Sequence, residues 1–359
     1  MRILVIGYYW SGKFSDYVAG GLKDIGHDVL FVYENELSFL QRLKIAIHTQ
    51  AWLYRLTRGL VELVKKRTKT VYEPYRTSFQ KRRQSKILPK ARRFHPDAVI
   101  VVQGSSLQVE VLEGLKRELN LPIAVWFGDN PLHWTDGSYD KKWAYFDIIF
   151  VVEPTWPERL RLFTSAPIFV LPLGTVTSLY FSIRGRIPEK YSADVAFVAA
   201  ASEERAEVLR HLVDYDLKIF GPRWDEYFDK YPKLRKHWHG AITPKEVNLV
   251  YNGSKIILGL YARETKNSVS QRFFDTGASG GFLLTEQKPQ ISQLFRDGIV
   301  AEFSSISELK EKIDYYLSHE SERKRMARLL QEEVVKNHTY KNRVGVIVRE
   351  PNQFMKKNG

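Results

Sequence analysis

One stretch of the sequence combines an arginine, an aspartate and small residues at helical spacing. Residues 264 to 286 read ETKNSVSQRFFDTGASGGFLLTE. A helix is predicted from 270 to 279, ended by two glycines and followed by a buried strand. Arg272 falls in the first turn, where free amides and the helix dipole favour an anion, and Asp275 on the same face could accept hydrogen bonds from a ribose diol. A surface Arg–Asp pair has the same spacing, so both interpretations stay open.

The loop WFGDNPLHW supplies candidates for a general base that would take a proton from an acceptor hydroxyl. Asp129 follows a buried apolar run, so we expect it at the carboxyl end of a strand, facing a cleft. His133 is close behind it. The competing interpretation is that Asp129 caps its own loop before Pro131 through an Asx hydrogen bond.

Two other patterns could bind phosphate or metal. Residues 7 to 13 have P-loop spacing, but Phe14 stands where that pattern needs the hydroxyl that ligates Mg²⁺, so an ordinary βαβ unit is favoured. His237 and His239 have a spacing that metal ligands could use on a strand, although a loop at Gly240 beside a bound ligand is favoured instead. The sequence DYD at 214–216 precedes a strand and is predicted to be a turn. No metal site is therefore expected, and the chain has no cysteine.

These residues are carried by two successive series of alternating strands and helices, which predict two parallel sheets covered on both faces. Residues 175 to 193 have no periodicity and read as a linker. The predicted organisation is a domain at 1–175 with a basic helical insertion at about 36–94, a linker at 176–193, a domain at 194–340 and a terminal helix or tail at 341–359. Ligands of such folds bind outside the carboxyl ends of the strands.

The composition points to an anionic partner. The chain of 359 residues carries a net charge of +14 and contains no apolar run near the roughly 18 residues that a membrane span needs. Much of the positive charge lies between Arg42 and Arg93, interleaved with apolar residues. Residues 39 to 93 could form an amphipathic helix on an anionic membrane surface, a helix packed on the sheet, or a nucleic-acid surface. We expect a cytoplasmic protein, with peripheral contact at the inner membrane face as a further hypothesis and nucleic acid as the less favoured partner.

Three segments occur in an order that resembles a known family. They are SVSQRFFDTGASGGFLLTE, then LFRDGIVAEFSSISELKEKIDYYLSHESERKRMA, then NHTYKNR. Together they resemble the C-terminal domain of the CgeB-like, spore-maturation-type glycosyltransferases of the GT-B superfamily. The resemblance runs from about Asp194 to Arg343. The N-terminal half resembles the family loosely, through its opening strand, WFGDNP and LPLGT.

The resemblance implies an α/β GT-B fold, with two Rossmann-like domains facing a cleft and a C-terminal helix that crosses back to the N-terminal domain. It also implies a nucleotide-diphosphate sugar as donor substrate, with no metal or other cofactor. The donor-binding residues that it implies or favours are Arg272 for the diphosphate, Asp275 for the ribose, a turn with Ala199, Ser202 and Arg205, and the loop with His239 and Gly240.

This sequence departs from the family at three positions. The family usually has Glu at the position of Asp275 and Gly at the position of Ala199. The wider retaining enzymes have Glu where this chain has Asn267, so a retaining mechanism does not follow.

The expected function is transfer of a sugar to a glycan, lipid-linked or protein-borne acceptor, with Asp129 and His133 as catalytic candidates. Two alternatives stay open at this point: a basic nucleic-acid-associated protein on a Rossmann-like scaffold, and a sugar-nucleotide epimerase of the same fold. The sequence leaves open the base, the sugar, the acceptor, the stereochemical outcome and the oligomeric state.

Overall fold

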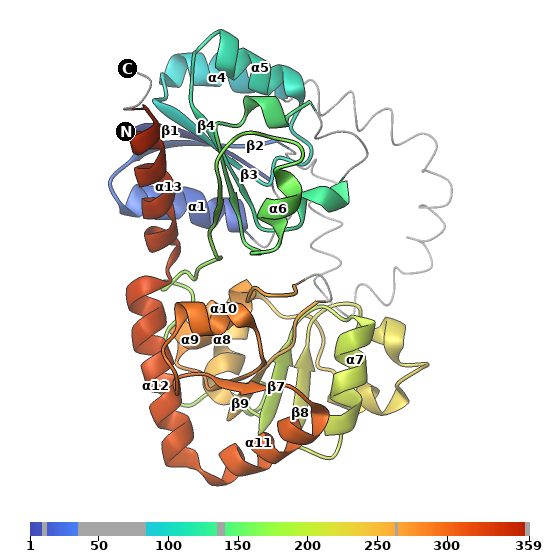
Figure 1. Cartoon of the computed structure of the whole chain (residues 1–359). Coiled ribbons are helices and arrows are strands. Elements are labelled where there is room, and N and C mark those ends of the chain that lie inside the picture. Colours follow the sequence, from blue (N-terminus) through green and yellow to red (C-terminus); the bar gives the residue numbers. More distant parts are fainter. Residues whose placement is uncertain (9–12, 35–83, 135–140, 263–264, 356–359) are drawn as a thin grey trace. The chain divides into compact units, whose positions relative to one another are not determined.

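The computed structural model describes residues 1–8, 13–34, 84–134, 141–262 and 265–355. These residues form two compact α/β units (Figure 1). Of the described residues, the first unit contains those up to Pro172 together with those from Tyr340 to Met355, and the second contains those from Leu173 to Thr339. Most of the basic segment predicted to be a helical insertion lies outside the described residues. Within the described part of the chain, no helix is both long enough and apolar enough to cross a bilayer.

The first unit is built on a parallel sheet with the strand order β2-β1-β3-β4-β5-β6. Four of its strands are apolar and almost wholly buried, because helices cover both faces of a parallel sheet. The strands are β1 (Arg2–Gly7), β2 (Asp28–Tyr33), β3 (Ala98–Val102), β4 (Ile123–Phe127), β5 (Ile148–Val151) and β6 (Ile168–Val170). The helices are α1 (Phe14–Asp24), α4 (Ile87–Phe94), α5 (Val109–Arg117), α6 (Trp156–Leu160) and α13 (Tyr340–Met355), with the 3₁₀ helices η1 (Pro131–Trp134) and η2 (Trp143–Tyr145).

The described residues at the end of β1 and the start of α1 pack closely together. The Ser15 hydroxyl accepts the Tyr8 N–H at 3.0 Å, and a side chain at Gly7 would place its Cβ only 2.3 Å from the Ser15 Cβ. The Phe14 ring meets Trp126 edge to face, with 4.8 Å between the ring centroids. Phe14 thus belongs to the core at the position where a P-loop would need a hydroxyl, as the ordinary βαβ interpretation requires.

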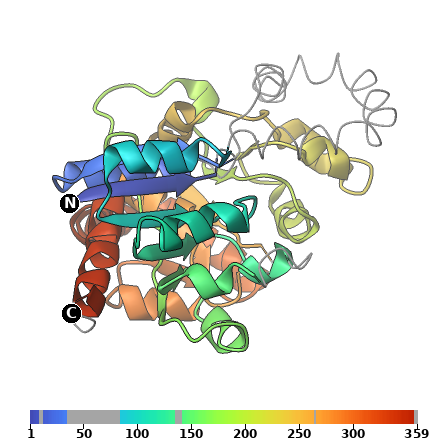
Figure 2. The ribbon, with the colours of Figure 1, turned by 90° about the horizontal axis from the view of Figure 1, so that it is seen from above.

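Helix α13 completes the first unit from the far end of the chain. Figures 1 and 2 show α13 (red) beside α1 (blue). The Tyr340 ring lies 6.0 Å from the Phe14 ring, 5.3 Å from the Tyr17 ring and 6.0 Å from the Trp126 ring, measured between centroids. The predicted return of the last helix to the N-terminal domain is therefore confirmed.

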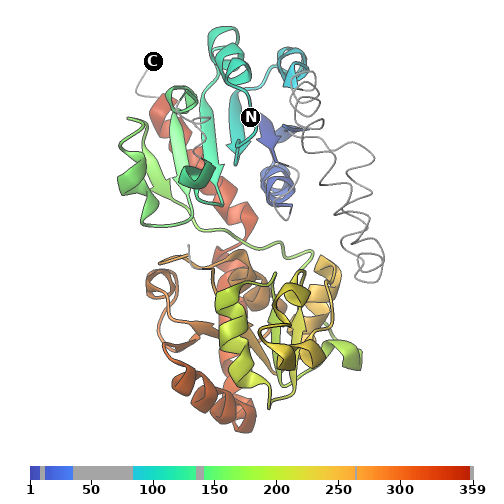
Figure 3. The same cartoon turned by 90° about the vertical axis from the view of Figure 1, so that its right-hand side faces the viewer.

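The second unit has a parallel sheet with the order β11-β10-β9-β7-β8. Its strands are β7 (Val195–Val198), β8 (Leu217–Phe220), β9 (Ile256–Gly259), β10 (Leu283–Glu286) and β11 (Ala301–Phe303). Its α-helices are α7 (Glu203–Leu209), α8 (Pro244–Gly253), α9 (Gln271–Ser279), α10 (Pro289–Leu294), α11 (Ile306–Ser318) and α12 (Glu320–Asn337), and its 3₁₀ helices are η3 (Glu189–Tyr191), η4 (Arg210–Leu212), η5 (Trp224–Tyr227) and η6 (Pro232–His237). Figure 3 shows this unit from another side, with α7 in yellow-green.

The two faces of the second sheet bury different helices. Along β7, Val195 and Phe197 point to a core shared with α7, α11 and the first half of α12, whereas Ala196 and Val198 point to a core shared with α8, α9 and the second half of α12. This alternation follows from the period of two along a strand. It places α8 and α9 on the same face of the sheet.

The segment predicted to be a linker, 176–193, lies in the second unit. Tyr180 is buried in the core under α8, and the Phe181 carbonyl accepts hydrogen bonds from the side-chain amides of Asn248 at 3.2 Å and Asn252 at 3.1 Å. Because these bonds come from side chains of one helix, the segment needs neither strand nor helix periodicity. The division between the units falls earlier, between Pro172 and Leu173.

We predict that Tyr340→Ala lowers the free energy of unfolding by about 3 kcal/mol, because a buried aromatic side chain leaves a cavity when it is truncated. Denaturation in urea measures the change. Phe163→Ala is the matched control in the same unit, since the Phe163 side chain is 46% exposed. Equal losses in the two variants would show that Tyr340 does not complete the core of this unit.

Candidate functional site

The second sheet reverses its strand order at β7. From β7 the chain adds β8 on one side and β9 on the other. In parallel sheets, ligands bind outside the carboxyl ends of the strands at such a switch point. A cavity of about 210 Å³, here called the β7 cavity, lies at the carboxyl ends of β7 and β8 and against α8 and α9. It is lined by Tyr180, Val198, Ala199, Ala200, Gly221, Pro222, Ile242, Val247, Tyr251, Arg272 and Asp275.

Two strand-to-helix turns meet at this cavity without room for a side chain between them. Gly221 follows β8 and has a φ of +141°, and a Cβ on it would lie 1.9 Å from the Ala199 carbonyl oxygen. The Gly221 N–H donates to the Gly240 carbonyl at 2.8 Å. Glycine is the residue that permits both this backbone conformation and this approach.

The turn after β7 is held by side chains that donate to three successive carbonyl oxygens. The carbonyls of 199, 200 and 201 accept from Trp224 Nε1 at 3.0 Å, Arg205 Nη1 at 2.9 Å and Arg223 Nη2 at 3.3 Å. Each carbonyl therefore has a fixed direction, and the turn is rigid where it lines the cavity.

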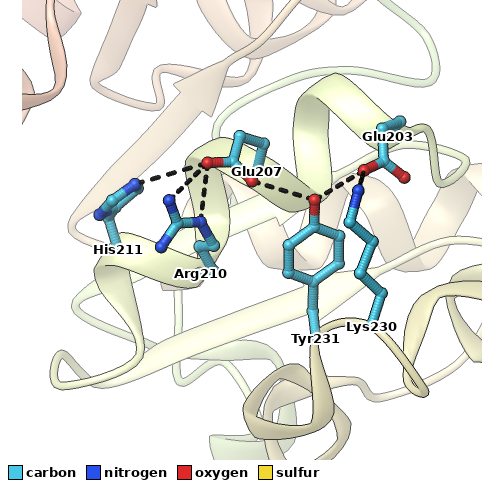
Figure 4. Close-up of polar contacts among 6 residues, drawn as sticks. All are labelled: Glu203, Glu207, Arg210, His211, Lys230 and Tyr231. Carbon is cyan, nitrogen blue, oxygen red and sulfur yellow. Dashed lines mark hydrogen bonds and ion pairs between the residues drawn. The ribbon is translucent and has the colours of Figure 1, made fainter.

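Helix α7 is also fixed to the segment that follows β8. The Tyr231 hydroxyl lies 2.7 Å from Glu203 Oε1 and 2.9 Å from Glu207 Oε2, so one phenol joins two carboxylates of the helix (Figure 4). Lys230 pairs with Glu203, and Arg210 pairs with Glu207. These exposed ion pairs contribute little individually. Together with the Tyr231 hydrogen bonds, the Lys230–Glu203 pair holds the start of α7 against the segment that follows β8.

Helix α9 presents a cation at its N-terminus. Its N-cap residue, Ser270, makes no side-chain capping bond, and Arg272 is the second residue of the helix. Among the described residues, Arg272 has no hydrogen bond and no ion pair, although its charge acts on several neighbours. An unpaired guanidinium at a helix N-terminus, where the helix dipole favours negative charge, is a favourable position for an anion.

A second guanidinium lies close to Arg272. Burial and the positive charge of Arg272 lower the pKa of Arg205 to about 10, while Glu286 and Glu204 act in the opposite direction. The buried Arg205 Nε atom has no hydrogen-bond partner. An anion placed near these two cations would relieve their mutual repulsion.

Asp275 is the buried carboxylate of the cavity. Its Oδ1 atom accepts from the Thr175 hydroxyl at 2.8 Å, and its Oδ2 atom accepts from Gln271 Nε2 at 3.2 Å. Burial raises the pKa of Asp275 to about 8, although both hydrogen bonds and the charge of Arg272 favour the ionised form. The cavity thus contains one carboxylate whose charge state changes near neutral pH.

Some of the residues predicted to bind the donor line the β7 cavity, and others lie outside it. Ala199, Arg272 and Asp275 line the same cavity, and Gly240 is one hydrogen bond away from it. Ser202 caps α7, where its hydroxyl accepts the Arg205 N–H at 3.4 Å. His239 does not line the cavity, and its ring packs on Phe220 at 5.5 Å between centroids. Arg205 donates to the Ala200 carbonyl of the turn and is not among the residues that line the cavity.

Histidine and carboxylate positions give no further metal candidate. The described residues contain no group of three or more His, Asp or Glu side chains placed to hold a metal ion. His237 Nδ1 lies 3.0 Å from the Leu217 carbonyl. Burial, followed by the charges of Lys218 and His237, lowers the pKa of His239.

In the first unit, Asp129 lies exposed just after β4. Gln103 Nε2 donates to Asp129 Oδ2 at 3.0 Å, and Gln103 Oε1 accepts the N–H groups of Gly128 at 2.6 Å and Asp129 at 3.2 Å. The Asx hydrogen bond of this loop is made by Asn130, whose Oδ1 accepts the Leu132 N–H at 3.0 Å. The Asx hydrogen bond that the competing interpretation gave to Asp129 is thus seen at the next residue, Asn130. The backbone of His133 lies in η1, and its side chain is outside the described residues.

Gln103 is a residue that the sequence interpretation missed. It is buried and has a φ of +67°, followed by Gly104 with a φ of +69°. Lys142 Nζ donates to the carbonyls of Gly104 at 3.3 Å and Ser105 at 3.0 Å and so holds this turn. A glutamine before glycine at the end of an apolar strand was the available signal.

Glu34, at the end of β2, is a second missed residue. Its side chain is buried, and one carboxylate oxygen has no hydrogen-bond partner. Burial raises the pKa of Glu34 to about 7, although the charge of Lys142 and hydrogen bonds from Ser106 favour the ionised form. Nothing in the sequence near Glu34 indicates this burial.

Comparison with known proteins agrees with the fold of the two units. A family model described as glycosyl transferase-like matches residues 204–349. Spore protein CgeB from Bacillus subtilis (strain 168) is 21% identical over 281 residues, which are 72% of this chain and 83% of CgeB. The chain is thus similar to glycosyltransferase-like proteins and to CgeB, and it has the GT-B fold.

Solved structures share this fold over nearly the whole chain. Sucrose-phosphate synthase from Thermosynechococcus elongatus has a TM-score of 0.62 at 10% identity, covering 99% of this chain and 100% of its own. HepE from Anabaena in complex with UDP-glucose has a TM-score of 0.61 at 10% identity, covering 98% and 100%. An alpha-glucosyltransferase in complex with UDP-glucose and DNA containing an abasic site has a TM-score of 0.64 at 12% identity, covering 97% and 99%.

We predict that the pH dependence of stability changes in Asp275→Asn. The pKa of Asp275 is raised from 3.8 to about 8 in the folded protein, so between these values the folded state holds a proton that the unfolded state has lost. This proton stabilises the wild type at low pH, and the stabilisation is lost as pH rises toward 8, by about 1 kcal/mol per pH unit. Asp275→Asn has no carboxyl group at this position, so its free energy of unfolding does not fall with pH for this reason. Urea unfolding of both proteins at about pH 5 and pH 7.5 tests it, and a difference in stability that is the same at both pH values contradicts it.

Proposed function

We propose that the β7 cavity binds the diphosphate and ribose of a nucleotide-sugar donor. The observation that supports this best is the pairing of an unpaired Arg272 at a helix N-terminus with a buried Asp275 one turn later, in one cavity. The guanidinium at a helix N-terminus suits a diphosphate, and a carboxylate suits the two hydroxyls of a ribose. Because HepE and the alpha-glucosyltransferase were solved with UDP-glucose, the donor in this proposal is a uridine-diphosphate sugar.

In this proposal the departing nucleotide diphosphate is stabilised by protein cations. Negative charge develops on the diphosphate as its bond to the sugar breaks. Arg272 and the N-terminus of α9 would face that charge. The nearby Arg205 would add to the positive potential at the same place. The reaction then needs no resident metal and no cofactor besides the donor substrate itself.

The acceptor in this proposal is a hydroxyl of a glycan, a lipid-linked glycan or a protein-borne glycan, deprotonated by Asp129. Asp129 is exposed at the carboxyl end of β4, and its carboxylate direction is set by the Gln103 amide. A base must reach the proton that it removes, and an exposed carboxylate with a fixed direction meets that need.

The first test of the donor site is nucleotide affinity. Arg272→Ala and Asp275→Ala should each weaken UDP binding by about 10- to 100-fold, since a hydrogen bond to a charged group contributes about 1.5–3 kcal/mol. Isothermal titration calorimetry measures this. Arg296→Ala removes an exposed arginine from the same unit and should leave affinity unchanged. Affinities within twofold of wild type in both cavity variants would place the donor elsewhere.

The acceptor side is tested by turnover. Asp129→Asn should lower the rate of sugar transfer by about 100-fold or more, because general base catalysis contributes about 10²–10⁴-fold, while UDP affinity stays the same. Release of UDP from a UDP-sugar in the presence of acceptor reports the rate. An unchanged rate with a competent acceptor would exclude Asp129 as the base.

We also propose that the basic segment contacts an anionic membrane surface where a lipid-linked acceptor would lie. Of this segment the structure describes α4, on which Lys90 and Arg93 are exposed. Co-sedimentation with vesicles that contain anionic lipid should occur at about 0.1 M salt and weaken at about 1 M, because the screening length falls from about 10 Å to about 3 Å. Equal binding to neutral vesicles, or none at low salt, would exclude this contact and favour a glycan or protein-borne acceptor.

A further inference from the structure

Asp275 receives one of its hydrogen bonds from a residue far away in the sequence. The Thr175 hydroxyl donates to Asp275 Oδ1 at 2.8 Å, and the two side chains belong to residues that are 1% and 3% exposed. Thr175 belongs to the sequence LPLGT and lies in neither a helix nor a named strand. The bond is therefore a buried tertiary contact, shielded from exchange with water.

The backbone of Thr175 is fixed independently of this bond. Its N–H donates to the His338 carbonyl at 3.1 Å, and Thr175 forms an isolated parallel bridge with Thr339. Both partners lie at the end of α12, where the described chain leaves the second unit. The hydroxyl is thus held in place before any ligand binds.

We propose that Thr175 is a positioning residue for the donor, which orients the Asp275 carboxylate and favours its ionised form for binding the ribose. This inference rests on the proposed role of Asp275. Thr175 donates to one carboxylate oxygen and Gln271 to the other, so the two donors together fix the plane of the group. Each oxygen of an ionised carboxylate accepts about two hydrogen bonds. One acceptor position on each oxygen therefore remains for the two ribose hydroxyls.

The surroundings of Asp275 leave few other groups to favour its charge. Arg272 faces it from the same helix, and Tyr251 faces it from α8. Burial, and then the charge of Asp275, raise the pKa of Tyr251, which stays neutral. From α12, Leu330, Gln331 and Val334 lie against α9 and carry no charge, and the titratable His338 at its C-terminal end stacks on Phe274 of α9. A hydrogen bond from a hydroxyl to the carboxylate is stronger in this buried setting than it would be at the surface.

The test compares Thr175→Val, which keeps the branched shape and removes the donor, with Thr175→Ser, which keeps the donor. UDP and inorganic pyrophosphate serve as probes, since only UDP contains a ribose. Thr175→Val should weaken UDP binding by about 10-fold or more at about pH 7, leave pyrophosphate binding within twofold, and move the pH midpoint of UDP affinity upward. Thr175→Ser should bind UDP within about threefold of wild type.

Other outcomes separate the two proposals. If Asp275→Ala binds UDP like wild type, the proposed role of Asp275 fails and this inference fails with it. If Asp275→Ala loses UDP affinity but Thr175→Val does not at any pH, the positioning role alone is overturned. A loss of both UDP and pyrophosphate in Thr175→Val, with an unmoved pH midpoint and no recovery in Thr175→Ser, would mean a general packing role and also overturns it.

Discussion

The close approach of Gly221 to the Ala199 carbonyl is the contact on which the shape of the β7 cavity depends. A Cβ at Gly221 would lie 1.9 Å from that oxygen. Trp224 Nε1 donates to the Ala199 carbonyl at 3.0 Å, and Trp238 Nε1 donates to the Gly221 carbonyl at 2.9 Å, so indole side chains fix both turns. With the turns after β7 and β8 held together in this way, the cavity has one closed wall. The charged groups of α9 then act across a space of defined shape.

The charges at and beside this cavity are unfavourable for the stability of the protein alone. Two guanidinium groups are close enough for the charge of Arg272 to lower the pKa of Arg205, and a carboxylate is buried with its pKa raised to about 8. Each arrangement is unfavourable for the protein alone. A bound diphosphate would offset the first, and a ribose diol would supply hydrogen-bond donors to the second. Perturbed ionisable groups concentrated in one cavity are typical of functional sites.

Much of this arrangement could be predicted from sequence, because local rules determine it. The apolar runs that end in small or turn-forming residues predicted the strands, and helical spacing put Arg272 and Asp275 on one face of a helix that starts at the cavity. The remaining errors concern contacts between distant residues. Residues 176–193 looked like a linker because their partners are side-chain amides in α8. Gln103 was missed because its effect depends on a positive φ, and the Asx bond that one interpretation gave to Asp129 is made by the neighbouring Asn130. Short-range patterns do not distinguish such cases.

Helix α13 has a consequence for how the chain reaches this structure during synthesis. The second unit is continuous in its described residues, from Leu173 to Thr339, whereas the first takes Tyr340 and the rest of α13 from beyond it. A ribosome releases the chain from its N-terminus, and domains generally fold as units. The contacts of Phe14, Tyr17 and Trp126 with the Tyr340 ring therefore cannot form until the whole second unit has been synthesised. The part of the protein made first is the part completed last, and its unfinished apolar face is the one that a nascent-chain chaperone would meet.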